Sequence, residues 1–168
     1  RARQMNAGAA RPAGPLLLFL HADTRLPADF NAQLQRFIGS GQQWGRFDVQ
    51  LDDSRIIFRV IATLMNLRSR WTGIATGDQA IFVLQEFFQR CNGFADIPLM
   101  EDIDFCTRAR RLSQPFCLTS SVLVSARRWQ KQGIARTILL MWWLRLAFFL
   151  GVSPQRLHRW YYPSPCPR

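Results

Sequence analysis

A run of five apolar residues near the start of the chain constrains the fold more than any other feature. The run, Leu16 to Leu20, follows the turn-rich segment Arg11-Pro-Ala-Gly-Pro15. A short apolar run bounded by such breakers is typical of a strand that is buried on both faces of a parallel sheet. Ligand sites in open α/β sheets lie just beyond the carboxyl ends of strands. His21 and Asp23 follow the run directly, so we expect them at a ligand site.

Strand-like and helix-like segments alternate after this run, which predicts an α/β fold. Further strands are expected at 46–51, 80–84 and 116–124. The first of these alternates polar and apolar residues, as a half-exposed strand does. Helices are expected from Pro27 to Gly39, at 55–68, around Phe87-Phe88, at 103–112 and at 134–152. A chain of 168 residues is long enough for one domain and too short for two of full size.

For the helix expected at 55–68, the sequence predicts both the cap at its start and the face that is buried. Asp52-Asp53-Ser54 precedes it and is expected to cap it. Its apolar residues recur at helical spacing and are expected to fill one broad buried face; they are Ile56, Phe58, Val60, Ile61, Leu64 and Leu67.

The charge of the chain favours polyanionic partners. Twenty-two basic residues against eleven acidic ones give a formal net charge of +11. Nucleic acid, anionic lipid headgroups and phosphorylated small molecules all suit such a charge. Lys131 is the only lysine, and arginine offers a planar fork for phosphate that lysine lacks. A GC-rich coding sequence is an alternative explanation of that arginine content.

The cysteines argue against a structural zinc site. They are too widely spaced to form a CxxC pair, and the chain has two histidines; the cysteines are Cys91, Cys106, Cys117 and Cys166. Unpatterned cysteines, together with the lack of a recognisable signal peptide, favour the reducing environment of the cytoplasm.

Four carboxylates are expected at strand ends or helix starts: Asp23, Asp78, Glu101 and Asp102. Acidic residues in the first turn of a helix are also common caps, and this reading remains open for each of them alone. Taken together, the four carboxylates could bind a metal ion and serve in acid–base catalysis. An aspartate that follows a buried strand can hold a hard divalent cation, and a second acid on a neighbouring loop can act as a general base on a hydroxyl.

Six blocks of the sequence agree in order and spacing with the family-2 glycosyltransferases. The blocks are Arg-x-x-x-Met-Asn-Ala-Gly at 1–8, Leu-Leu-Phe-Leu-His-Ala-Asp-Thr at 17–24, Thr-Gly-Asp-Gln at 76–79, Asn-Gly-Phe at 92–94, Met-Glu-Asp-Ile at 100–103 and Ser-Ala-Arg-Arg-Trp at 125–129. The chain resembles that family from residue 1 to about 162. Within it, the chain looks most like the bacterial arsenosugar-biosynthesis-type subgroup.

The resemblance implies a GT-A fold, which is Rossmann-like, and an inverting transfer of sugar from a nucleotide-diphospho-sugar to an acceptor hydroxyl. It also implies a divalent metal, Mn²⁺ or Mg²⁺. Asp23 corresponds to the family's metal and diphosphate ligand, whereas His21 replaces the first acid of the usual Asp-x-Asp. Asp102, in the block with Glu101, corresponds to the general base. The resemblance places Arg3, Asn6, Arg127, Arg128 and Trp129 with the donor, and Asp78 and Gln79 with the acceptor.

The resemblance also leads us to expect a partial GT-A domain over residues 1–162. Members of the family begin with strand-helix units that carry much of the nucleotide pocket, and nothing corresponding precedes Arg1. The donor site would then be half-built, and the sheet would have an open edge that favours aggregation or pairing with another chain, including a second copy. The proline-rich tail at 163–168 is expected to be disordered.

The most hydrophobic stretch, 134–152, raises the question of a membrane. Arg136 and Arg145 interrupt it, and each would cost about 2.5–3.5 kcal/mol at the centre of a bilayer, which disfavours a spanning helix. Its tryptophans and arginines suit an amphipathic helix at the headgroup interface, peripheral to the inner face of the plasma membrane. A helix buried against the sheet, or at a dimer interface, is the alternative. The basic and aromatic character continues to residue 162.

Two other functions remain open at this stage. A nucleic-acid-binding module is suggested by arginines and aromatic residues interleaved over 124–162. The arginines are spread along the whole chain and no motif of that class is present, so no nucleic-acid partner is expected. A truncated scaffold without catalysis is the third hypothesis. The sugar, the nucleotide base and the acceptor are not identified by these residues.

Overall fold

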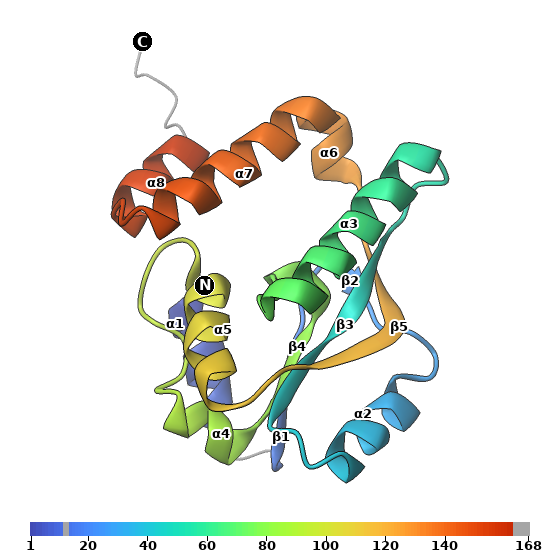
Figure 1. The fold of residues 1–168 in the computed structure, drawn as a ribbon, viewed down its shortest axis with the longest axis vertical. Coiled ribbons are helices and arrows are strands. Elements are labelled where there is room, and N and C mark those ends of the chain that lie inside the picture. Colours follow the sequence, from blue (N-terminus) through green and yellow to red (C-terminus); the bar gives the residue numbers. More distant parts are fainter. Residues whose placement is uncertain (12–13, 163–168) are drawn as a thin grey trace.

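The computed structural model describes residues 1–11 and 14–162. Within these residues, helices surround one sheet (Figure 1). The helices are α1 (Ala2–Ala9), α2 (Phe30–Gly39), α3 (Ile56–Thr72), the short 3-10 helix η1 (Gly77–Gln79), α4 (Gln85–Arg90), α5 (Glu101–Leu112), α6 (Arg127–Gln132), α7 (Ile134–Phe149) and α8 (Pro154–Tyr161). The strands are β1 (Leu16–Phe19), β2 (Thr24–Arg25), β3 (Trp44–Leu51), β4 (Ile81–Leu84) and β5 (Phe116–Val124). The predicted α/β class is confirmed, whereas the tail at 163–168 lies outside the described residues.

The strands form one mixed sheet in the order β1-β4-β3-β5-β2. β3 and β5 run parallel, and the other neighbouring strands run antiparallel. Because β1 and β3 are both antiparallel to β4, the strands β1, β3 and β5 all point the same way. Their carboxyl ends therefore lie at the same end of the sheet.

Two predictions about strand environment were wrong. β1 is not a central strand of a parallel sheet: it pairs antiparallel with β4 at the edge of the sheet, and its side chains are half-buried. β3 is not half exposed: it is the middle strand, and most of it is buried. The polar positions of β3 misled the prediction because Arg46 and Asp48 satisfy each other inside the protein rather than facing water.

Each face of the sheet carries its own apolar core. Along β4, Ile81 and Val83 belong to one cluster of buried residues, whereas Phe82 between them belongs to the other. Successive side chains of a strand point to opposite faces, so the sheet lies between two apolar layers. α1, α4 and α5 pack in the first cluster and α2 packs in the second, on the other side of the sheet in Figure 1.

The packing prediction for α3 was wrong for most of its apolar residues. Phe58 and Ile61 are buried, but Ile56, Val60, Leu64 and Leu67 are exposed. The residue at the start of the helix, Arg55, makes no side-chain capping bond. Asp53 accepts a hydrogen bond from the backbone N–H of Arg55 at 3.0 Å, while Asp52 accepts one from Ala126. With Phe58 and Ile61 buried and the other four residues exposed, α3 packs on the sheet along a narrow strip, and its opposite side is apolar and exposed.

The three last helices lie together at one end of the molecule (Figure 1). α7 packs against α6 and α8, and Leu144, Ala147 and Leu157 of α7 and α8 are buried in the first cluster. Many other apolar side chains of α7 are exposed. Among the residues that the structure describes, no helix has the length and apolar character needed to cross a membrane.

Candidate functional site

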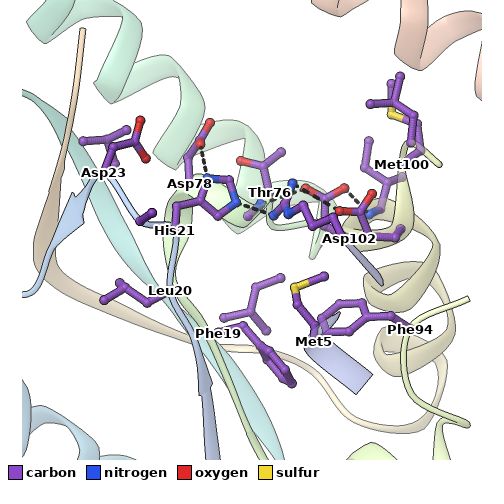
Figure 2. A pocket seen from close by; sticks show the side chains of 18 of the residues that line it. Met5, Phe19, Leu20, His21, Asp23, Thr76, Asp78, Phe94, Met100 and Asp102 are labelled. Atoms are coloured by element: carbon purple, nitrogen blue, oxygen red, sulfur yellow. Dashed lines mark hydrogen bonds and ion pairs between the residues drawn. The ribbon is translucent and has the colours of Figure 1, made fainter. Parts of the chain in front are cut away.

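A cavity of about 780 Å³ opens at the end of the sheet where the carboxyl ends of β1 and β5 lie. We call it the main cavity. Its walls come from α1, β1, η1, the first turn of α5 and the helices α6, α7 and α8. Figure 2 shows side chains from several of these elements converging on it. The carboxyl ends of strands are where α/β sheets generally place ligands.

Asp23 reaches the main cavity because β1 ends at Phe19 and the chain then turns. The turn is closed by a hydrogen bond of 3.1 Å from Thr24 N–H to the carbonyl of His21. Asp23 is exposed and makes no hydrogen bond or ion pair with any described residue. In Figure 2 it lies to one side of the contacts made by His21. Its carboxylate is therefore available to a ligand.

His21 joins two charged residues across the cavity. Its Nδ1 lies 3.2 Å from Asp78 Oδ1, and its Nε2 contacts a guanidinium nitrogen of Arg1. Arginine only donates hydrogen bonds, so Nε2 accepts and the proton lies on Nδ1, facing Asp78. Burial would raise the pKa of Asp78, but the hydrogen bond from His21 and the nearby charges of Arg1 and Arg128 hold that pKa below its usual value. Arg1 also pairs with Glu101 at 3.1 Å, so a polar chain runs from Asp78 to Glu101.

Asp102 faces the main cavity from the first turn of α5. Its Oδ2 accepts a hydrogen bond of 2.7 Å from the backbone N–H of Gly77, and its Oδ1 accepts one of 2.8 Å from the backbone N–H of Ile103. Glu101 beside it is buried. Burial, followed by the charge of Asp102, raises the pKa of Glu101. Asp102 is thus held by two backbone donors, and Glu101 lies behind it as the partner of Arg1.

Another part of the cavity wall is basic and aromatic. Arg128 and Trp129, on α6, both line the main cavity. Arg128 donates a hydrogen bond to Tyr161 of α8 and lies over its ring, 5.1 Å from the ring centre. Arg127 turns instead into an adjoining pocket of about 620 Å³. Asp23 and Arg128 line both hollows, so the two hollows adjoin at these residues.

Three of the predicted site residues are not brought to either hollow. Arg3 is exposed and forms an ion pair of 2.8 Å with Asp96. The amide of Asn6 is occupied by the backbone of Phe94, which it both donates to and accepts from. Gln79 is buried, where it bonds Asn66 and the backbone of Thr76. The remaining predicted residues lie on the two hollows; they are His21, Asp23, Asp78, Glu101, Asp102, Arg127, Arg128 and Trp129.

Sequence reasoning missed three residues of the main cavity. Arg1 connects His21 with Glu101, and Gly77 bonds Asp102; both stand in the blocks at 1–8 and 76–79, but nothing in those blocks shows that they make these contacts. Arg145 lines the cavity from α7. It had a signal, because a charged residue inside the most apolar stretch of a chain needs a partner or a function.

Asp23 is the residue of the site that could hold a metal ion. Within residues 1–11 and 14–162 no three His, Cys, Asp or Glu side chains gather as a ligand set. Mg²⁺ commonly binds through one or two carboxylates together with substrate phosphates and water. Asp23 fits this mode, because its carboxylate is exposed and has no partner among the described residues.

Comparison with known proteins identified no relative of this chain. No family model matches the chain, and neither a curated protein nor a solved structure matches it.

Proposed function

We propose that this chain is an inverting, metal-dependent glycosyltransferase that moves a sugar from a nucleotide-diphospho-sugar to an acceptor hydroxyl. One observation carries the proposal. The carboxylates Asp23 and Asp102 and the guanidinium of Arg128, which lie far apart in the sequence, line the same cavity. These are the residues that the resemblance to family-2 glycosyltransferases assigns to the metal, the general base and the diphosphate. We propose a GT-A fold on the same ground.

The donor end of the site is the junction of the two hollows. There Asp23 would hold a divalent cation together with the diphosphate, and the cation would neutralise charge on the phosphate oxygens. Arg128 would donate hydrogen bonds to the same group. Negative charge grows on the diphosphate as the sugar leaves, and charge-assisted hydrogen bonds to it strengthen in the transition state.

The acceptor end of the site is Asp102. Its carboxylate would take the proton of the acceptor hydroxyl as that oxygen forms its bond to the anomeric carbon of the sugar. The bond from that carbon to the phosphate oxygen breaks, and the nucleoside diphosphate departs with the electron pair. One displacement with one base inverts the anomeric carbon. Gly77 would keep the carboxylate of Asp102 turned toward the cavity.

A test of the reaction uses water as the acceptor. We expect slow Mn²⁺-dependent release of nucleoside diphosphate from a donor sugar, with NMR showing first the inverted anomer. Asp102→Asn keeps an oxygen for the N–H of Gly77 but lacks the base, so we expect its rate to fall by about a hundredfold or more. Asp104→Asn, on the same helix but outside the cavity, is the control. Equal rates in all three proteins would contradict the proposal.

We also propose that α7 and α8 rest on an anionic membrane surface, which would place the protein at the inner face of the plasma membrane. Trp142, Trp143 and Trp160 are 70%, 56% and 41% exposed, and the rings of the last two lie 6.2 Å apart. Arg136, Arg156 and Arg159 on the same helices are exposed. Tryptophan prefers the headgroup region, and arginine is attracted by anionic lipid. The charge of +11 favours such a lipid surface over contact with a second copy.

A further inference from the structure

The adjoining pocket gathers basic side chains from two segments that are far apart in the sequence. Arg25 stands on β2, and Arg127 and Lys131 stand on α6. Arg128 lines the same pocket where it meets the main cavity. Leu123 of β5 also lines the pocket, and it is the direct cross-strand partner of Arg25. The side chains of such a pair lie side by side on one face of a sheet, so Arg25 extends from the sheet into the pocket wall.

Two aspartates that precede α3 anchor the helix on the other side of the pocket. Asp52 accepts a hydrogen bond from the backbone N–H of Ala126, at the start of α6. Asp53 accepts one of 2.8 Å from the side-chain amide of Gln130, within α6. The basic residues of α6 therefore have a defined position at the pocket.

The positive charge of this pocket is not neutralised by the protein. The side chains of Arg25, Arg127 and Lys131 make no hydrogen bond or ion pair with any residue that the structure describes. Two carboxylates line the pocket: Asp52 accepts a backbone hydrogen bond, and Asp23 is the proposed metal ligand. Arg127 and Lys131 also lie four residues apart in one helix, a spacing at which like charges are destabilising. An anion bound in the pocket would relieve this repulsion.

We propose that the adjoining pocket binds a phosphate monoester, separate from the diphosphate of the sugar donor. A phosphate monoester has close to two negative charges and three acceptor oxygens, and guanidinium and ammonium groups bind it through charge-assisted hydrogen bonds. In the proposed function, the donor's diphosphate lies at Asp23 and Arg128. Arg25 and Lys131 line the adjoining pocket but not the main cavity, so they are available to a second anion. This site goes beyond the proposed function and does not depend on it.

Two sources of the phosphate group fit the position of the pocket. One is a soluble phosphorylated molecule, and the other is the headgroup of an anionic lipid. Lys131 lies two residues before Gly133, from which α7 starts, and α7 is the helix that we place on a membrane surface. The experiments below separate the two sources.

The first experiment measures binding of inorganic phosphate by calorimetry, with EDTA present to remove divalent metals. We expect the pocket variant, Arg25→Gln with Lys131→Gln, to bind phosphate about tenfold more weakly or worse, because two charge-assisted contacts are removed. The control variant, Arg59→Gln with Arg111→Gln, loses the same charge from two exposed residues outside both hollows. Equal affinity in the pocket variant and the unaltered protein, or an equal loss in the control variant, would overturn the site.

Thermal unfolding separates binding from structure. Without phosphate, the pocket variant should unfold at the same temperature as the unaltered protein or a higher one, because repulsion within α6 is reduced. Phosphate should raise the unfolding temperature of the unaltered protein and of the control variant, but not of the pocket variant. A lower unfolding temperature in the pocket variant, with the phosphate effect retained, would assign the two residues to the fold alone.

Asp23→Ala distinguishes this site from the donor site. We expect this variant to bind phosphate in EDTA at least as tightly as the unaltered protein does, because a negative charge that lines the pocket is removed. Phosphate binding that requires Mn²⁺ and is lost in Asp23→Ala would show that the pocket belongs to the donor's diphosphate, and would contradict the proposal. Metal-independent phosphate binding in a chain that binds no nucleotide-sugar would contradict the transferase function and leave this site standing.

Competition identifies the source of the phosphate group. Displacement of inorganic phosphate by glycerol 1-phosphate supports a soluble ligand. Displacement only by vesicles that contain phosphatidic acid supports a lipid headgroup. Displacement by neither contradicts the proposal.

Discussion

The carboxylate of Asp102 accepts a 2.7 Å hydrogen bond from the backbone N–H of Gly77. This contact joins the first turn of α5 to η1, the short helix that also carries Asp78. It holds the proposed general base against the chain segment that carries the acid bonded to His21. The two carboxylates are thereby fixed on one side of the main cavity.

Replacing Gly77 by alanine should break this arrangement. A Cβ at this position would collide with the side chains of Arg1 and His21. Because the atoms it would meet are the ends of two side chains, which can move aside, we expect Gly77→Ala to displace the contact of Arg1 with His21, to lower donor turnover, and to cost stability near the lower end of the about 1–3 kcal/mol typical of overpacking. Urea unfolding and the rate of donor hydrolysis measure the two effects.

Gly8→Ala is the matched control for that substitution. Gly8 lies in α1 with nothing near the position that a Cβ would take, and alanine favours a helix over glycine by about 0.5–1 kcal/mol. We expect this variant to be as stable as the unaltered protein or more so. Equal behaviour of the two alanine variants would contradict the close packing around Gly77.

The raised pKa of Glu101 predicts a specific dependence of stability on pH. A carboxyl group whose pKa is higher in the folded state binds more protons there, so its contribution to stability is lost as the pH rises. Glu101→Gln cannot ionise and escapes this loss. We therefore expect its free energy of unfolding, relative to the unaltered protein, to increase between about pH 4 and about pH 7. A relative stability that falls over this range would contradict the burial of an ionisable Glu101.

Asp78→Asn should show the opposite trend. The pKa of Asp78 is held below its usual value, so its ionised form stabilises the folded state, and that stabilisation is lost as the pH falls. We expect Asp78→Asn to lose more stability at about pH 7 than at about pH 4. Unfolding by urea at the two pH values provides the comparison. A loss of the same size at both would show that His21 does not hold the charge of this carboxylate.

Membrane contact predicts that the tryptophans of α7 control binding to lipid. We expect the chain to sediment with vesicles of phosphatidylglycerol, less so at high salt, and to ignore neutral vesicles. The double variant Trp142→Ser with Trp143→Ser should bind about tenfold more weakly or worse, because two large apolar side chains no longer enter the interface. Trp71→Ser, which alters an 84% exposed tryptophan of α3, is the control.

Self-association is the competing outcome for the same helices. A dimer of the unaltered protein in analytical ultracentrifugation, lost in the double variant, would show that α7 meets a second copy. Such a result, with no binding to anionic vesicles, would contradict the membrane proposal.

The positions of the helices and strands could be predicted because their signals are local. The strand at 116–124 has the bounds expected from its apolar run, and the helix expected at 103–112 begins only two residues earlier. The neighbours of a strand have no local signal. The same apolar run serves in the middle or at the edge of a sheet, so β1 was placed wrongly. Asp48 of β3 pairs with Arg46 in the same strand and with Arg70, which is 22 residues away, and no pattern within the strand reveals the second pairing.

The motifs pointed to some residues of the candidate site. They did not point to contacts with backbone groups far away in the sequence, such as that of Asp102 with Gly77. Asp23, Asp102 and Arg128 lie on one cavity, as the order of the motifs led us to expect. Asn6 and Gln79 stand in the same motifs, yet their amides bond the protein itself. Only tertiary structure separates a polar side chain that faces a ligand from one that ties two segments together.

The most direct test of the transferase account is calorimetry of UDP-sugars and GDP-sugars with Mn²⁺ present. The account predicts that the unaltered chain binds one of these donors only with the metal, that Asp23→Ala loses this binding, and that Glu86→Ala, which removes an exposed carboxylate from α4, retains it. Donor binding that is unaffected by Asp23→Ala or by removal of Mn²⁺ would contradict the account. So would a chain that binds no donor and is retained on nucleic acid in a salt-dependent way.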